Sequence, residues 1–196
     1  KYVKNQFQTP VYYYISPKLW AWKSYRIKSI KKYIDKMYTI FPFETEFYAQ
    51  YNYPVTYVGN PTVDSIANFH ASKNNRNFRA ENQLDSRPIV ALLAGSRRQE
   101  ISKCLPTMVA MADKFPTFQF LVAAAPGIEL GYYNQFLTPS VKIVSDSTYA
   151  LLDESYAAIV NSGTATLETG LLKVPQVVVY HVIGDRIASL LKKILI

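Results

Sequence analysis

Several features that define other classes of protein are scarce in this 196-residue sequence. Cys104 is the only cysteine, so no disulfide can form within the chain, and a cytosolic setting is favoured. No apolar run reaches the roughly 20 residues that a membrane-spanning helix needs. There is also no GxSxG elbow, no Walker lysine motif and no CxxC pair. The short signatures of serine hydrolases, P-loop proteins and thiol oxidoreductases are therefore missing.

Positive charge is concentrated near the beginning of the chain, which has a net charge of +8. A basic stripe contains one acid, Asp35, and seven basic residues: Lys18, Lys23, Arg26, Lys28, Lys31, Lys32 and Lys36. Together with nearby aromatic residues it is typical of a surface for anionic lipid headgroups, although a solvated helix face explains it equally well. Nucleic acid is disfavoured, because no recognition module accompanies the charge. The candidate membrane-facing residues are Trp20, Trp22, Lys28, Lys31 and Lys32.

Strands and helices are predicted to alternate along the first 64 residues. Strands are expected at residues 10–15 (buried), 37–41 and 55–58, and helices at 24–34 and 43–51. This order implies parallel pairing with helical crossovers. Residues 65–87 are polar and rich in Asn and Ser, so we expect a linker there.

The alternation resumes from residue 88 to residue 196. Strands are expected at 88–94, 118–123, 141–144, 157–160 and 176–180. Helices are expected at 98–114, 130–137, 147–154 and 164–172, with an amphipathic helix from about Asp185. The predicted fold class is α/β, and this second domain is a Rossmann-like, doubly wound parallel sheet.

One candidate site is the turn after the strand at 157–160, where the sequence reads SGTATLE. A strand that stops at Ser162-Gly163 and enters a helix at Thr164 presents free backbone N–H groups, which attract phosphate. Glu168 follows about one turn later, where a carboxylate can accept hydrogen bonds from a ribose diol. An ordinary turn with a favourable first-turn charge is the alternative.

A second candidate site is Gly95-Ser96-Arg97, after the strand at 88–94. Gly95 permits a tight turn, and Ser96 with Gln99 matches a capping box. Arg97 can contact a pyrophosphate and offset charge on a leaving group. The alternative is a capped helix with solvated arginines. Because carboxyl ends of parallel strands share one rim, both turns are expected to face the same crevice.

Other residues give weaker signals. Cys104 is expected to be a small core residue. His70 and His181 are expected to be structural or surface residues, since neither has metal-ligand companions, with a place lining the site as the alternative for His181 at the carboxyl end of a strand. Asp146 is interpreted as a helix cap, with a place in a nucleobase pocket as the alternative. No metal site is predicted.

The motifs resemble those of one family. Ser16-Pro17-x-x-Trp20-Ala21-Trp22, Pro42-Phe43-Glu44 and Val58-Gly59-Asn60-Pro61 occur in the same order and spacing as in lipid-A-disaccharide synthases. Gly95-Ser96-Arg97 and Ser162-Gly163-Thr164-Ala165-Thr166-Leu167-Glu168 do so as well. The resemblance covers nearly the whole chain. Ala94 and Asn161 depart from the residues that are common at their positions in that family.

The resemblance implies a B-type glycosyltransferase architecture with two Rossmann-like domains, the first of them incomplete here. It implies transfer of 2,3-diacylglucosamine from UDP-2,3-diacylglucosamine to 2,3-diacylglucosamine 1-phosphate, with release of UDP and no metal or organic cofactor. Arg97 would contact the diphosphate and Glu168 the ribose. Gly95, Ser96, Ser162, Gly163 and Thr164 would line the phosphate site. The enzyme would be cytoplasmic and peripheral on the inner membrane of a Gram-negative bacterium.

The chain does not begin with Met, so we expect it to be part of a longer protein. The acidic general base would then lie upstream of Lys1, and the isolated chain would be inactive. Exposed apolar edges in residues 1–64 would favour a homodimer or poor order. Two other functions stay open: another UDP-GlcNAc-type transferase or 2-epimerase of the same fold, and a non-catalytic nucleotide-sugar-binding or membrane-binding module.

Overall fold

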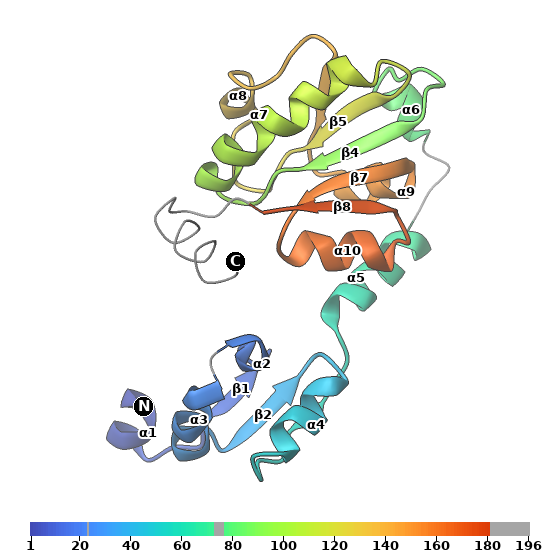
Figure 1. The fold of residues 1–196 in the computed structure, drawn as a ribbon. Coiled ribbons are helices and arrows are strands. Elements are labelled where there is room, and N and C mark those ends of the chain that lie inside the picture. The colour runs from blue at the N-terminus through green and yellow to red at the C-terminus, as the bar shows by residue number, and fades with distance from the viewer. Residues whose placement is uncertain (23, 73–76, 181–196) are drawn as a thin grey trace, which may run out of the picture. The chain divides into compact units, whose positions relative to one another are not determined.

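A computed structural model describes residues 1–22, 24–72 and 77–180 of the chain, without the side chain of Trp22. Lys23, His181 and the helix expected from about Asp185 lie outside the described residues. The chain divides into two compact units, one that runs to Asn68 and one that starts at Phe69 (Figure 1).

The first unit contains a parallel sheet of three strands in the order β1-β2-β3 within the described residues. The strands are β1 (Tyr12–Tyr14), β2 (Lys36–Thr39) and β3 (Thr56–Tyr57). The helices around them are α1 (Tyr2–Phe7), α2 (Leu19–Trp22), the 3-10 turn η1 (Ser24–Arg26), α3 (Ile27–Tyr33) and α4 (Phe43–Ala49). Their apolar sides form one buried cluster of Leu19, Ile27, Ile30, Met37, Tyr48 and Tyr53.

The burial expected for β1 is wrong. Tyr12 and Tyr14 are 64% and 57% exposed, although both pair with β2 through the backbone. Aromatic residues favour a strand through their fit to a pleated surface, and that preference does not reveal which layer, if any, covers it. β1 therefore forms an open edge of the described sheet.

The segment expected to be a linker contains two helices, α5 (Pro61–Ala71) and α6 (Phe78–Glu81). The Asn60 side chain accepts a hydrogen bond from the Thr62 N–H at 3.0 Å, and Pro61 suits a first helical position. Asn77 caps α6 by accepting from the Ala80 N–H at 3.1 Å. These polar caps, rather than an apolar stripe, mark helices in an Asn- and Ser-rich stretch.

The second unit contains a sheet of five parallel strands in the described residues, in the order β6-β5-β4-β7-β8. The strands are β4 (Ile89–Leu93), β5 (Gln119–Ala123), β6 (Val141–Val144), β7 (Ser155–Asn161) and β8 (Gln176–Val179). The connections first run from β4 to β5 and β6 and then return to the other side of β4. Neighbours β4 and β7 therefore border the topological switch point of a Rossmann-like sheet.

Helices cover both faces of this sheet, as the prediction of a doubly wound fold requires. Residues of α7 (Arg98–Lys114) and α8 (Leu130–Tyr133) pack in one core cluster with Leu92 and Val122. Residues of α6, α9 (Thr148–Asp153) and α10 (Thr164–Leu171) pack in the other cluster with Ala91 and Leu121. Every residue of β4 is buried, which explains its continuous apolar run. The predicted α/β fold class is confirmed.

Candidate functional site

The two turns selected from the sequence follow neighbouring strands. The turn at Gly95 comes after β4 and the turn at Ser162 comes after β7, and these strands pair through Leu93 and Val160 near their carboxyl ends. In open α/β sheets, the crevice outside the carboxyl ends at the switch point is the usual ligand site. The sheet topology thus brings the two candidate turns to the same crevice.

Gly95 packs closely against Asn161, the last residue of β7 before the Ser162 turn. It has a φ of +115°, and a Cβ there would lie 2.6 Å from Glu100 Oε2 and 2.8 Å from Asn161 Nδ2. Only a residue without a side chain fits both the backbone angle and the space. Asn161 is buried, and its Oδ1 lies 3.6 Å from the Cys104 sulfur, which confirms that Cys104 is a core residue. Asn161 thus lies buried between the Gly95 turn and helix α7.

The expected capping box of Ser96 and Gln99 is wrong by one residue. Arg97 is the extended residue before α7, and Glu100 is the acid that caps the turn. Glu100 Oε2 accepts from the backbone N–H groups of Ser96 and Arg97 at 2.9 and 3.3 Å. Its Oε1 accepts from Arg97 Nη1 at 2.6 Å. Two N–H groups that could have met a phosphate are therefore already bonded to an internal carboxylate.

The guanidinium of Arg97 stays open to solvent, because the Arg97 side chain is 78% exposed despite the contact with Glu100. Burial would raise the pKa of Glu100, but the hydrogen bonds from Arg97 and the Ser96 N–H outweigh burial and lower this pKa below its ordinary value. Glu100 is thus held as an anion beside Arg97. Arg97 retains further N–H groups for a second anion.

The second turn is more open to a ligand. Ser162, Gly163 and Thr164 are exposed, and no neighbouring atom lies within 4 Å of a Cβ built at Gly163. The Ser162 N–H donates to the Val179 carbonyl at 2.9 Å, which anchors the turn to β8. The first N–H groups of α10 have no partner inside their own helix, as at every helix start. This end of α10 therefore provides the more accessible anion contacts.

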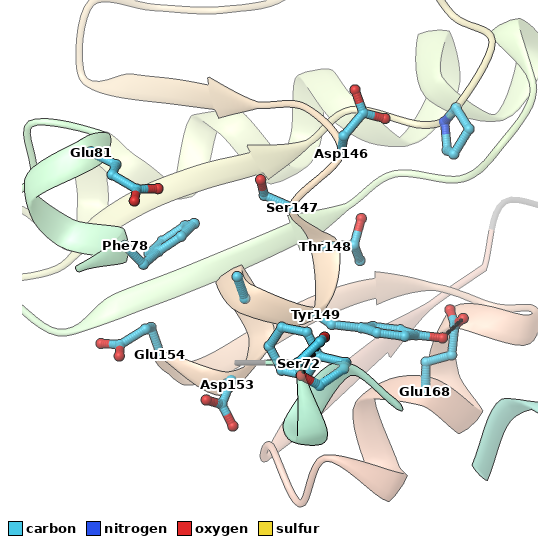
Figure 2. Close-up of a pocket in the computed structure, with 13 residues that line it drawn as sticks. Ser72, Phe78, Glu81, Asp146, Ser147, Thr148, Tyr149, Asp153, Glu154 and Glu168 are labelled. Atoms are coloured by element: carbon cyan, nitrogen blue, oxygen red, sulfur yellow. Dashed lines mark hydrogen bonds between the residues drawn. The ribbon is translucent and has the colours of Figure 1, made fainter. Parts of the chain in front are cut away.

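A pocket of about 560 Å³ lies beside this crevice in the second unit. Its lining includes Asp146, Tyr149 and Glu168, with Phe69 and Phe78 as aromatic members. Figure 2 shows the Tyr149 ring extending toward Glu168, and the Tyr149 hydroxyl donates to Glu168 Oε1 at 2.9 Å. The expected capping role of Asp146 is wrong. Asp146 has a φ of +50°, and the N-cap residue of α9 is Ser147. Asp146 lines the pocket instead.

Burial, followed by the hydrogen bond to Glu168 and the charge of that carboxylate, raises the pKa of Tyr149 to about 12. Tyr149 is therefore a hydrogen-bond donor at every physiological pH.

Among the described residues, no group of three or more His, Cys, Asp or Glu side chains is arranged to hold a metal ion. Within the same residues, no helix combines the length and apolarity needed to cross a membrane.

Comparison with known proteins identifies the family. A family model described as lipid-A-disaccharide synthetase matches residues 1–196. The chain belongs to the lipid-A-disaccharide synthetase family. The resemblance seen in the motifs is thereby confirmed.

Two curated lipid-A-disaccharide synthases show the extent of the similarity. The protein of Coxiella burnetii (strain Dugway 5J108-111) is 41% identical over 178 residues, which cover 88% of this chain and 46% of that protein. The protein of Koribacter versatilis (strain Ellin345) is 37% identical over 200 residues, with 92% of this chain and 50% of the relative covered. The chain thus spans about half the length of the curated relatives it matches.

The fold also matches solved structures. A structure of S. aureus MnaA with UDP has a TM-score of 0.65 and 12% identity, and covers 98% of this chain and 61% of that one. At this identity the likeness shows a shared fold, and it confirms the Rossmann-like class across both units.

The family motif in the first unit has a structural explanation. Ser16 is buried, and its hydroxyl donates to Glu44 Oε1. Glu44 Oε2 accepts from the backbone N–H groups of Ile40 and Phe41 at 3.2 and 3.0 Å. Ser16 follows β1, and Ile40 and Phe41 follow β2, so one buried carboxylate joins two strand ends to the start of α4. The Ser-Pro and Pro-Phe-Glu motifs of the lipid-A-disaccharide synthetase family thus meet in one contact.

The candidate membrane-facing residues are exposed where they are described. Lys28, Lys31 and Lys32 lie on the exposed side of α3, while Ile27 and Ile30 are buried. Trp20 is 41% exposed and packs edge-to-face on Phe43, with ring centroids 5.1 Å apart. Basic and aromatic side chains therefore both reach the surface of the first unit.

Tyr149 and Glu100 belong to the site, but the sequence did not predict either of them there. Tyr149 contacts Glu168 across 19 positions of sequence and from a different helix, so no periodic pattern pointed to the pair. Glu100 had a usable signal, because Glu at the third helical position is a capping residue once Arg97 is taken as the helix boundary. His70 lies in α5 against the Phe69 ring, with centroids 5.2 Å apart.

Proposed function

We propose that this protein is a glycosyltransferase of lipid A biosynthesis. It transfers 2,3-diacylglucosamine from UDP-2,3-diacylglucosamine to 2,3-diacylglucosamine 1-phosphate and releases UDP. One observation carries the proposal: in a chain of this family, the Gly95 turn packs against Asn161, the residue of β7 that directly precedes the Ser162 turn, at the switch point of the second sheet. Family membership favours the transferase over a 2-epimerase, whose likeness rests on fold alone.

The second unit is proposed to bind the UDP part of the donor. The exposed start of α10 suits the diphosphate through the N–H groups of Gly163 and Thr164 and through the helix dipole, and Ser162, whose own N–H is bonded to Val179, would add its hydroxyl. Arg97 adds an exposed positive charge that can offset the negative charge that grows on the departing UDP. Glu168 in the pocket suits the ribose hydroxyls. Gly95 and Ser96 complete the proposed phosphate side.

The proposal is tested by calorimetric titration of UDP into the parent protein and into Glu168→Ala. Binding by the parent that weakens at least tenfold in the variant is expected, since a carboxylate holding a diol makes charge-assisted hydrogen bonds of about 1.5–3 kcal/mol. Asp113→Ala is the matched control. Asp113 is an exposed carboxylate near the last residue of α7, at the other end of that helix from the Gly95 turn. Equal binding by parent and Glu168→Ala would contradict the ribose assignment.

The transfer itself is tested on the full-length protein by product analysis. A disaccharide carrying the 1-phosphate, together with UDP, is the expected product pair. Formation of an epimerised UDP-sugar without an acceptor would instead assign the protein to the 2-epimerase reaction.

Acyl-chain substrates require access from a bilayer, and we propose that the first unit supplies part of this contact. Lys28, Lys31 and Lys32 would attract anionic headgroups, and Trp20 would lie at the interface. Replacing the three lysines by Glu is expected to weaken binding to phosphatidylglycerol vesicles by several kcal/mol, at about 1 kcal/mol per lost positive charge.

Replacement of Lys103, Lys114 and Lys173 by Glu is the matched control for this membrane contact. These lysines are exposed on the second unit, and their replacement changes the net charge by the same amount. Equal losses of vesicle binding in both triple variants would show that net charge, and not the α3 surface, governs membrane binding.

A further inference from the structure

Glu168 does not stand alone in the pocket, because one of its oxygens is already bonded. The Tyr149 hydroxyl donates to Glu168 Oε1 at 2.9 Å, and both side chains line the pocket (Figure 2). We infer that Tyr149 is a positioning residue, which fixes the Glu168 carboxylate for the ribose diol without touching the ligand itself. The inference rests on the proposed binding of UDP and names a second residue of the same site.

Tyr149 is itself well placed to hold another side chain. It is the second residue of α9, and its ring packs against Phe69 with centroids 5.8 Å apart and planes at 70°. Both side chains of the hydrogen bond are half-buried. A tyrosine has few rotatable bonds, so a ring packed in this way directs its hydroxyl to a defined point. The fixed partner in the pair is therefore Tyr149, and the positioned partner is Glu168.

The consequence for Glu168 follows from its chemistry. A free glutamate loses rotamer freedom when it binds a ligand, and this ordering lowers affinity. A carboxylate has lone pairs for about four hydrogen bonds, so one bond from Tyr149 leaves Oε2 and part of Oε1 for the diol. The hydroxyl of Tyr149 stays protonated across the working pH range, so the contact persists there. Tyr149 thus prepares the acceptor geometry before the ligand arrives.

The test compares two ligands on the full-length protein: UDP and 2′,3′-dideoxy-UDP, which lacks the diol. Tyr149→Phe keeps the ring against Phe69 and removes only the hydroxyl. The variant is expected to bind UDP about three- to tenfold more weakly, the ordering cost of one side chain, and to bind dideoxy-UDP within about twofold of the parent. In a Glu168→Ala background, Tyr149→Phe is expected to cause no further loss of UDP affinity.

Each outcome decides the inference. An equal loss of affinity for UDP and dideoxy-UDP in Tyr149→Phe would overturn the inference, because a misfolded pocket or a direct contact away from the diol gives that pattern. The inference would also be overturned if Tyr149→Phe bound UDP as tightly as the parent while Glu168→Ala bound UDP more weakly. That result would leave the proposed function standing. A parent that does not distinguish UDP from dideoxy-UDP would overturn the inference and the ribose contact together.

Discussion

The buried contact between Ser16 and Glu44 gives the sharpest prediction about stability. Glu44 is 1% exposed and accepts hydrogen bonds from the Ser16 hydroxyl and from the N–H groups of Ile40 and Phe41. Ser16→Ala removes one hydrogen bond to a charged group, so it is expected to lower the free energy of unfolding by about 1.5–3 kcal/mol. Glu44→Ala leaves all three donors without their acceptor, and its expected cost is about 3–5 kcal/mol.

The two costs should not add, because both single variants lose the same Ser16–Glu44 bond. A double variant is expected to be more stable than the sum predicts by about 1–2 kcal/mol. Urea unfolding followed by tryptophan fluorescence suits the measurement. Trp20 and Trp22 are the only tryptophans of the sequence, so the signal reports on the first unit.

Glu46→Ala provides the matched control for the Glu44 variant. Glu46 lies in the same first turn of α4 but is exposed, so its loss is expected to cost less than about 1 kcal/mol. If Glu44→Ala were no more destabilising than Glu46→Ala, the buried carboxylate would not be joining the strand ends. Full additivity of Ser16→Ala and Glu44→Ala would likewise refute the direct contact.

Two further predictions concern the Gly95 turn. Gly95→Ala places a side chain at a positive φ and within 3 Å of neighbouring atoms, so it is expected to lower the free energy of unfolding by about 2–4 kcal/mol, measured by urea unfolding followed by circular dichroism. Gly127→Ala is the control: Gly127 has a φ of +80° but open space around it, so its replacement is expected to lower the free energy of unfolding by only about 1 kcal/mol. Glu100→Gln should be less stable than the parent at neutral pH. Because the pKa of Glu100 is lowered in the folded state, the parent loses this advantage as pH falls below about 4.3, where unfolded Glu protonates. The stability gap should therefore narrow in acid, and a gap independent of pH would count against an ionised cap. Asp113→Asn, which also neutralises a carboxylate but at the other end of α7, is the control for Glu100→Gln.

The second unit was the more predictable one from sequence. The helix at 98–114 and the strand at 141–144 were expected at the residues where α7 and β6 are found. Both have physical signals that do not depend on the rest of the fold: a long amphipathic period in one and a β-branched run between turn residues in the other. The central strands β4 and β5 of this parallel sheet are buried along their whole length, so their runs are continuously apolar and easy to see.

The errors come from features that depend on distant parts of the chain. α5 has a single buried apolar residue, Ile66, and its helix is marked by a polar cap at Asn60. β1 is rich in tyrosine, but whether a strand is covered depends on neighbours that its own composition does not specify. The cap at Glu100 was missed by one residue, because Ser96 and Arg97 both precede a possible helix start, and only the backbone angles at Arg97 decide between them.

The structure separates the roles that the sequence had grouped together in the phosphate site. Motif spacing alone treats the Gly95 turn and the Ser162 turn as equivalent sources of backbone N–H groups. In the folded chain Glu100 already bonds to the N–H groups of Ser96 and Arg97, and a second anion would have to compete with this carboxylate for them. The start of α10 has no such internal anion among its described contacts, and its residues are exposed. A diphosphate is therefore expected to gain most of its backbone contacts from α10, while the first turn contributes the exposed side chain of Arg97.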